Sequence, residues 1–295
     1  MELRHLSYFL AVAREQNITR AAEHLNISQP TLSTQMKELE EELGKQLLVR
    51  GRRRVTLTDE GMVLRRRAEE ILSLVQRTEA EISSDDQALA GDIHIGCGET
   101  SGLALIAQAA RTLQDRCPGI HYSLLSGNAD FVLDQLDKGL VDFGLVYGQV
   151  DERKYEILPS AVSDSWGVLM RRDCPLAQKD AIGPDDLRGE RLIVSQQSGA
   201  RSLFSRWFSC PLERLHVVAS YNLVLNASFL TRSGFGHTLC FSGLIEPEAD
   251  DELCFRPLAP ALVSEAHIVW KKYRVLGKAC ERFIRQLEEM LSSPR

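Results

Sequence analysis

The chain lacks an apolar run long enough to cross a membrane. A transmembrane helix needs about 18 or more consecutive apolar residues, and no stretch of the 295-residue sequence approaches that length. The first stretch, MELRHLSYFLAVAREQ, places its apolar side chains on one side of a helix and has no signal-peptide pattern. Both absences predict a cytoplasmic protein without a membrane partner.

Motifs of common enzymes and of zinc or redox sites are also missing. There is no G-x-S-x-G, no H-E-x-x-H and no Walker A sequence, and GCGETSG lacks the spacing of a dinucleotide fingerprint. The seven cysteines contain no C-x-x-C pair and have no histidine at metal-ligand spacing. We therefore expect no enzyme, no catalytic residue, no metal and no cofactor, and cysteines that pack as small apolar groups.

A net positive charge is absent too, because the formal charge is −6. This value does not indicate a nucleic-acid-binding protein, but only charge within a Debye length of ~10 Å acts on a bound strand. The segment from Lys45 to Arg54 holds five Lys or Arg residues and no acid. With 44% hydrophobic residues, the chain is long enough for two or three domains with cores of their own.

Residues 17–44 have the pattern of two helices joined by a tight turn. Ile18, Ala21, Ala22 and Leu25 line one face of a short helix that begins near Thr19. Ser28 is a good N-cap for the second helix. The inward residues of that helix recur at intervals of four, three and four and are Leu32, Met36, Leu39 and Leu43. An ordinary helical hairpin with a solvated face is the alternative.

The outer face of the second helix and the segment after it favour DNA binding. Amides and hydroxyls near the helix start can reach base edges in the major groove, and the helix N-terminus can meet a phosphate. The alternating Val55 and Leu57 then predict a small wing whose arginines lie on the DNA backbone. The predicted DNA-contacting residues are Ser28, Gln29, Pro30, Thr31, Ser33, Thr34, Lys37, Arg50, Arg52, Arg53 and Arg54.

These pieces resemble the N-terminal half of LysR-type transcriptional regulators. The resemblance is carried by Ala21-Ala22 with Leu25, Ile27-Ser28-Gln29-Pro30, Leu39 with Leu43-Gly44, Leu47-Leu48 with Arg50, and Leu57-Thr58 with Gly61. It implies a winged helix-turn-helix that binds double-stranded operator DNA, with RNA polymerase as a candidate partner. It also implies that an oxidant sensor using a pair of cysteines is an alternative to a metabolite sensor.

One long helix is expected from Thr58 to about Asp86. Thr58 caps it, and Asp59 and Glu60 place negative charge in its first turn. A narrow apolar seam suits a partner helix better than a globular core, and in the resembling family this helix dimerises. Packing on its own domain is the alternative. The seam consists of Leu64, Ala68, Ile71, Val75, Thr78 and Ile82.

Alternating strands and helices follow and favour parallel sheets. Strands are expected at 92–98, 121–127, 141–148, 166–177, 191–196, 216–220, 237–241, 254–258 and 266–272. Helices are expected at 103–113, 130–138, 202–208, 223–233 and 277–291. The predicted fold is α+β overall: an all-α winged helix-turn-helix, a linker helix and two α/β lobes. The lobes look like the effector domain of the family, which is similar to type 2 periplasmic binding proteins.

The predicted boundaries follow these pattern changes. They are a winged helix-turn-helix at 1–58, a linker helix at 59–86, a hinge at 87–91, lobe I at 92–162 with 266–295, and lobe II at 163–265.

Polar residues that follow the strands predict an effector site between the lobes. In open α/β sheets ligands bind beyond the carboxyl ends of strands, near helix N-termini. Simple helix capping is the alternative for several of them. Glu99 would oppose an anionic effector and Arg201 would attract one, so the effector's charge stays open. The candidates are Thr100, Ser101, Asn128, Tyr147, Gln196, Gln197 and Ser198.

The sequence therefore predicts a regulator that binds operator DNA and senses a small-molecule effector. Its expected assembly is a homodimer through the linker helix, and a homotetramer through further contacts of the lobes. A two-lobed small-molecule-binding protein without a DNA function is the remaining alternative, but such a protein has no need of an arginine wing.

Overall fold

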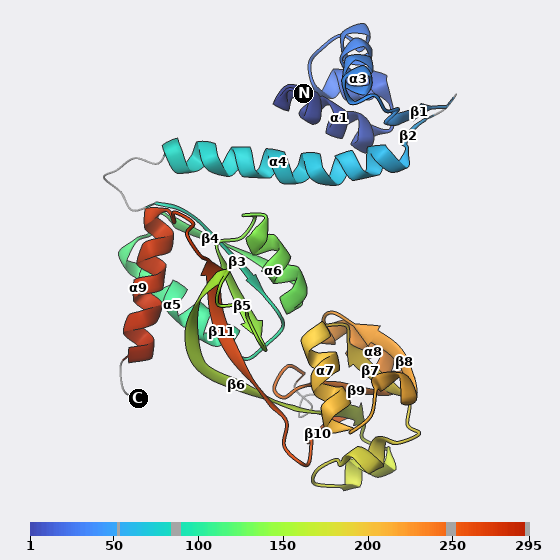
Figure 1. Cartoon of the computed structure of the whole chain (residues 1–295), viewed down its shortest axis with the longest axis vertical. Helices are drawn as coiled ribbons and strands as arrows, with labels where there is room; N and C mark the ends of the chain where they lie inside the picture. Colours follow the sequence, from blue (N-terminus) through green and yellow to red (C-terminus); the bar gives the residue numbers. More distant parts are fainter. Residues whose placement is uncertain (52–53, 84–89, 246–251, 293–295) are drawn as a thin grey trace. The chain divides into compact units, whose positions relative to one another are not determined.

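The computed structural model describes residues 1–51, 54–83, 90–245 and 252–292. The chain divides into two compact units, residues 1–83 and residues 84–295 (Figure 1). Unit 1 is helical with a small hairpin, and unit 2 is a mixed α/β structure. No helix in the described ranges is long and apolar enough to span a membrane.

Three helices and a hairpin form the core of unit 1. They are α1 (Leu3–Glu15), α2 (Ile18–His24), α3 (Gln29–Leu43), β1 (Leu48–Arg50) and β2 (Val55–Leu57). Three of the four side chains predicted to face inward from α3 are buried, namely Leu32, Met36 and Leu39, and they share a core with Phe9, Val12 and Ala21. The prediction was wrong for Leu43, which is the last residue of α3 and is 40% exposed, because the helix ends there beyond the core. The two strands pair antiparallel, with Leu48 opposite Leu57. The predicted helix pair and wing are therefore present, while Arg52 and Arg53 lie outside the described residues.

The long helix is α4 (Asp59–Ser83), and its start is as the sequence predicted. Thr58 accepts a hydrogen bond from the Gly61 amide at 3.0 Å. The described helix ends at Ser83, and the predicted last turn lies outside the described residues.

Part of the predicted seam is buried within unit 1 itself. Ala68 is fully buried and Leu64 packs against the core that α1 and α3 share. Ile71 and Val75 are half-buried and Thr78 is exposed, whereas the side chain of Ile82 lies outside the description. The first turns of α4 therefore pack on unit 1, as the alternative interpretation held. The part of the seam that remains accessible to a partner helix begins near Ile71.

Unit 2 consists of two lobes built on one continuous strand path, β4-β3-β5-β11-β6-β9-β7-β8, with β10 paired to β6. Lobe I contains the predicted βαβαβ order, and its three strands are parallel. These elements are β3 (Gly91–Cys97), α5 (Leu103–Arg116), β4 (Ile120–Ser126), α6 (Ala129–Asp137) and β5 (Phe143–Tyr147).

Two long strands, β6 (Tyr155–Arg171) and β11 (Val263–Lys271), run from one lobe to the other (Figure 1). The first part of β6 pairs antiparallel with β11, and its last part pairs with β9 (His237–Phe241) and β10 (Leu253–Pro257). The sequence prediction was wrong here, since it began this strand at 166 and continued it to 177. The start of β6 was missed because the segment 159–165, PSAVSDS, is rich in polar residues. The predicted end at 177 was too late because a 3-10 turn, η1 (Pro175–Gln178), follows the strand.

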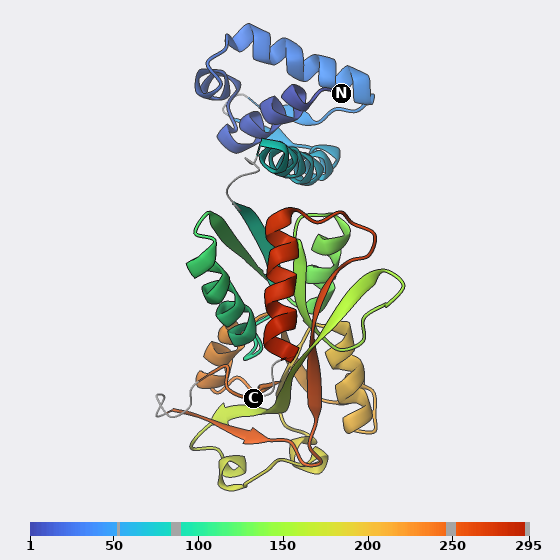
Figure 2. The same cartoon turned by 90° about the vertical axis from the view of Figure 1, so that its left-hand side faces the viewer.

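Lobe II surrounds a core of Trp166, Phe204 and Leu239. Its remaining elements are η2 (Pro184–Leu187), β7 (Leu192–Ser195), α7 (Ser198–Trp207), η3 (Leu212–Arg214), β8 (Val217–Tyr221) and α8 (Val224–Arg232). Helix α7 begins four residues before the predicted 202. The last helix, α9 (Lys278–Ser292), returns to lobe I and packs beside α5 through Phe283 and Leu287 (Figure 2).

Candidate functional site

The N-terminal end of α3 presents the polar surface that the sequence predicted. The Ser28 hydroxyl accepts a hydrogen bond from the Thr31 amide at 3.3 Å and contacts the Thr31 hydroxyl at 2.7 Å. Capping fixes the start of the helix, because it satisfies one of the amides that have no partner inside the helix. The remaining predicted residues of α3 are exposed or half-buried, and they are Gln29, Pro30, Ser33, Thr34 and Lys37.

The wing is joined to α3 by side-chain contacts. The Arg50 guanidinium donates to the Ser33 hydroxyl at 3.3 Å. The Glu40 carboxylate accepts from the amides of Leu47 at 2.7 Å and Leu48 at 2.9 Å. Glu40 was not predicted to have a role, although it sets the position of the hairpin beside α3. Arg54 is exposed at the other end of the hairpin turn.

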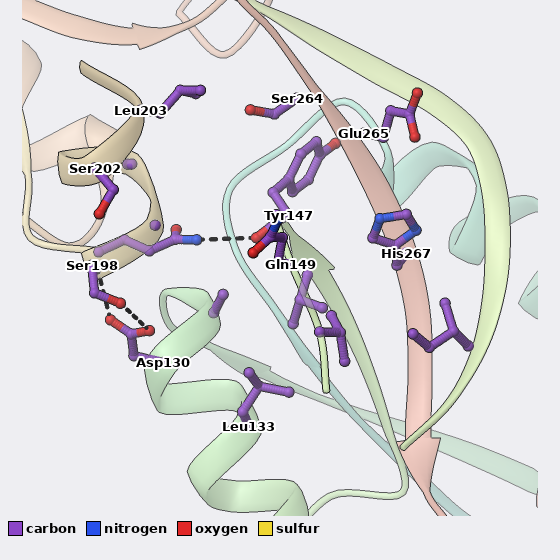
Figure 3. Close-up of a pocket in the computed structure, with 18 of the residues that line it drawn as sticks. Asp130, Leu133, Tyr147, Gln149, Ser198, Ser202, Leu203, Ser264, Glu265 and His267 are labelled. Carbon is purple, nitrogen blue, oxygen red and sulfur yellow. Dashed lines mark hydrogen bonds between the residues drawn. The ribbon is translucent and has the colours of Figure 1, made fainter. Parts of the chain in front are cut away.

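In unit 2, a cavity of about 1150 Å³ lies between the two lobes (Figure 3). Lobe I lines it with the start of α6 and the end of β5, and lobe II lines it with the first turns of α7. Strand β11 forms another wall through Ser264, Glu265 and His267. Three of the seven predicted effector residues line this cavity, namely Tyr147, Gln197 and Ser198.

Thr100 and Ser101 instead bind a buried carboxylate, Asp164, which the sequence analysis missed. Thr100 donates to Asp164 at 2.6 Å, and the hydroxyls of Ser101 and Tyr147 donate to the same carboxylate. Only 3% of Asp164 is exposed. Burial, together with the hydrogen bond to Asp164, raises the pKa of Tyr147 well above its usual value. The predicted ligand-binding hydroxyls thus tie strands β3, β5 and β6 together where the lobes meet.

The other two predicted residues have local partners outside the cavity wall. Asn128 caps α6, where its side-chain oxygen accepts from the Phe131 amide at 3.0 Å. Gln196 is exposed, and its amide nitrogen lies 3.5 Å from the Ser220 hydroxyl. Asn128 is therefore a helix cap, as the alternative interpretation held, and not a residue of the cavity wall.

Further hydrogen bonds connect lobe I to the first residues of α7 and α8 in lobe II. Asp130 of α6 accepts from both the amide and the hydroxyl of Ser198, each at 3.0 Å. Gln197 donates to the Tyr147 carbonyl at 3.2 Å, and Figure 3 shows both contacts at the cavity wall. Glu99 accepts from the amide of Val224, the first residue of α8, and from the next amide at 3.4 Å.

Acidic and aromatic side chains stand among aliphatic and small polar ones in the wall of the cavity. The Tyr147 and Phe241 ring centroids are 4.8 Å apart, and those of Phe241 and Trp166 are 4.0 Å apart. Among the described lining residues the carboxylates are Asp130, Glu152, Glu156 and Glu265, whereas the Lys and Arg residues are Lys272 and Arg206. Arg201, which the sequence analysis considered as an anion-attracting group, pairs with Glu213 at 3.2 Å.

All seven cysteines have free thiols in the structure. Burial raises the pKa of Cys240 to about 12, which keeps that thiol protonated and unreactive near neutral pH. Cys174 lies 4.0 Å from His237, whose Nε2 is 3.3 Å from Glu190. In the described part of the chain, no group of three or more His, Cys, Asp or Glu residues is arranged to hold a metal ion.

Family models match both units. The bacterial regulatory helix-turn-helix protein model of the lysR family matches residues 3–62, and the LysR substrate binding domain model matches residues 86–292. The chain therefore belongs to the LysR family and is a ligand-responsive, DNA-binding transcriptional regulator.

One similar protein matches nearly the whole chain, and another matches about two thirds of it. The Hca operon transcriptional activator HcaR of Escherichia coli is 30% identical over 300 residues, which cover 99% of each protein. A hydrogen peroxide-inducible genes activator of Dickeya chrysanthemi is 32% identical over 194 residues, 66% of this chain and 63% of that protein.

The solved structure of full-length CbnR in complex with its target DNA has the same fold. Its TM-score is 0.73 at 20% identity, with 98% of this chain and 99% of that one covered.

Proposed function

We propose that α3 enters the major groove of an operator and that the hairpin of β1 and β2 lies along the DNA backbone. The observation that carries this proposal is the capped N-terminal face of α3, with Arg50 bound to Ser33 at its side. Amides and hydroxyls at the start of such a helix can read base edges, whereas arginines at the wing neutralise phosphates without reading sequence.

The test separates base contacts from phosphate contacts. Thr34→Ala should weaken binding to the cognate operator by roughly 1–3 kcal/mol and leave binding to random DNA nearly unchanged. Arg54→Ala should weaken binding to both DNAs and reduce the slope of log affinity against log salt by about 0.9. Affinities would be measured by fluorescence anisotropy on operator DNA located by footprinting beside the gene for this protein. Equal losses on both DNAs from both substitutions would contradict the proposed roles.

We further propose that the interlobe cavity holds a small polar effector. Tyr147, Gln197 and Ser198 line a space that both lobes enclose, so a ligand there contacts two bodies whose relative position it can bias. Three of the four remaining predicted positions take supporting roles: Thr100 and Ser101 position Tyr147 through Asp164, and Asn128 caps α6.

The proposed domain division follows the sequence boundaries, with the linker helix as the dimer contact and further lobe contacts in a tetramer. Because the family consists of regulators, we infer that the chain has no catalytic activity. We also infer that it acts in the cytoplasm, where operator DNA is available to it.

A further inference from the structure

Two helices of lobe II begin at carboxylates supplied by lobe I. Asp130 holds the first residue of α7 through the Ser198 amide and hydroxyl, each at 3.0 Å. Glu99 holds the first amides of α8, those of Val224 and Leu225. Both acids come from loops or first turns that follow lobe I strands, so each contact spans the interlobe boundary. Each is a helix cap supplied by a distant part of the chain.

This arrangement changes what the interlobe space can bind. The start of a helix carries a partial positive charge and amides without an internal partner, and it attracts carboxylates and phosphates. Here the Ser198 amide already has an anionic partner. An anionic ligand would have to displace Asp130 and would then lie close to a second negative charge. Charges of like sign at short range repel strongly where water is partly excluded.

The rest of the described cavity wall carries three carboxylates, those of Glu152, Glu156 and Glu265, against two cationic side chains, those of Lys272 and Arg206. Glu156 comes from β6 and Glu265 from β11, and both line the cavity with Asp130. Lys272, one of the two Lys or Arg side chains among the described lining residues, donates to the Glu152 carbonyl at 2.8 Å. The three aromatic rings of Tyr147, Phe241 and Trp166 add surface that suits an uncharged or cationic group.

We propose that Asp130 and Glu99 act as internal anionic ligands of α7 and α8, and that Asp130, which lines the interlobe cavity, excludes carboxylates and phosphates from it. The effector is then a molecule without an anionic group. This assignment rests on the proposed effector role of the cavity and names the chemical class of its ligand.

The test uses acetate as the probe and the full chain as the protein. Removing the internal carboxylate in Asp130→Ala should expose the Ser198 amide and create an acetate site that the wild type lacks. We expect acetate affinity to rise at least tenfold over wild type, measured by the shift of the Ser198 amide resonance. Acetate should also raise the thermal midpoint of the variant, whereas chloride at equal ionic strength should not. Glu99→Ala should behave in the same way at the Val224 amide.

Asp134→Ala is the matched control, because Asp134 is exposed on the same helix α6 and pairs with Lys138 at 2.7 Å. It should show no gain in acetate affinity. If Asp130→Ala does not fold, Asp130→Asn keeps an acceptor for the Ser198 amide and removes the charge, and it should still gain acetate affinity over wild type.

Acetate binding to wild type as strong as to the variants would overturn the proposal, and so would the absence of any gain in the variants. These measurements do not involve DNA or transcription, so the assignment can fail while the regulatory function stands. Conversely, loss of operator binding in the DNA experiment would leave the acetate result intact.

Discussion

At the scale of single residues, Asp164 is a buried carboxylate that depends on the hydroxyl groups around it. Its carboxylate is 3% exposed and accepts hydrogen bonds from Thr100, Ser101 and Tyr147. A buried carboxylate is tolerated only where such donors replace water. The same donors lose their acceptor when the acid is removed, so the cluster depends on every member.

Asp164→Ala should therefore lower the free energy of unfolding of unit 2. Ser101 is exposed and Thr100 and Tyr147 also contact each other, so removing the shared acceptor costs about 1–3 kcal/mol. Urea unfolding of the full chain followed by circular dichroism would measure the loss. Asp134→Ala, which removes an exposed acid, is the control and should leave the midpoint close to wild type. A midpoint for Asp164→Ala equal to that of the control would show that water replaces the carboxylate without cost.

Single-residue roles at the site were only partly predictable from the sequence. The residues that follow strands β5 and β7 could be placed at the cavity because parallel strands end at a common edge. The hydrogen-bond partner of Thr100 could not be predicted from the sequence, because Asp164 is 64 residues away along the chain. Asp130 and Glu99 had no signal as caps, because a capping acid normally lies within a few residues of the helix it caps.

At the scale of elements, α4 has two different stretches. Its first turns belong to the core of unit 1 through Leu64 and Ala68, and a half-buried apolar seam continues through Ile71 and Val75. One uninterrupted sequence pattern thus serves two kinds of packing, which periodicity alone cannot distinguish.

Ile71→Asp should weaken self-association by tenfold or more, equivalent to about 1.4 kcal/mol, because it places a charge in the proposed helix contact. Sedimentation velocity across a concentration series would measure this. Gln76→Asp introduces the same charge at an exposed position of α4 and should leave the assembly unchanged. Ala68→Asp differs from both, since a charge at this fully buried position should unfold unit 1. A wild-type assembly for Ile71→Asp would place the dimer contact elsewhere.

Most elements were predictable because each has one clear period. The apolar faces of α3, α5 and α6 recur every three or four residues, and β5 is a short apolar run that is almost entirely buried. Strand β6 was only half predicted. Its middle passes between the lobes, where Ser160 donates to the Ala266 carbonyl and Asp164 accepts from Thr100. These polar side chains do not fill an apolar core, so the segment has no strand-like alternation.

At the scale of the whole molecule, DNA contact and effector binding belong to separate units. A large side chain on the cavity wall should therefore abolish the response and spare operator binding. Ser202→Trp, on the exposed face of α7 that lines the cavity, is the suitable change. Operator affinity and reporter transcription under conditions that activate the wild type would be compared. Gln108→Trp, exposed on α5, is the control. A normal response in Ser202→Trp would rule out this cavity as the effector site.

The two long strands that cross between the lobes determine which movements are available. Strands β6 and β11 are hydrogen-bonded to each other from Tyr155 to Ser165, with a bulge between Glu265 and His267. A paired antiparallel ribbon resists stretching because the backbone of each strand is already close to its full extension. It twists at low cost, and a bulge increases the local twist. The lobes are thus joined by a β-ribbon that twists more easily than it stretches. We therefore expect a ligand bound between the lobes to rotate one lobe relative to the other more readily than to change the distance between them.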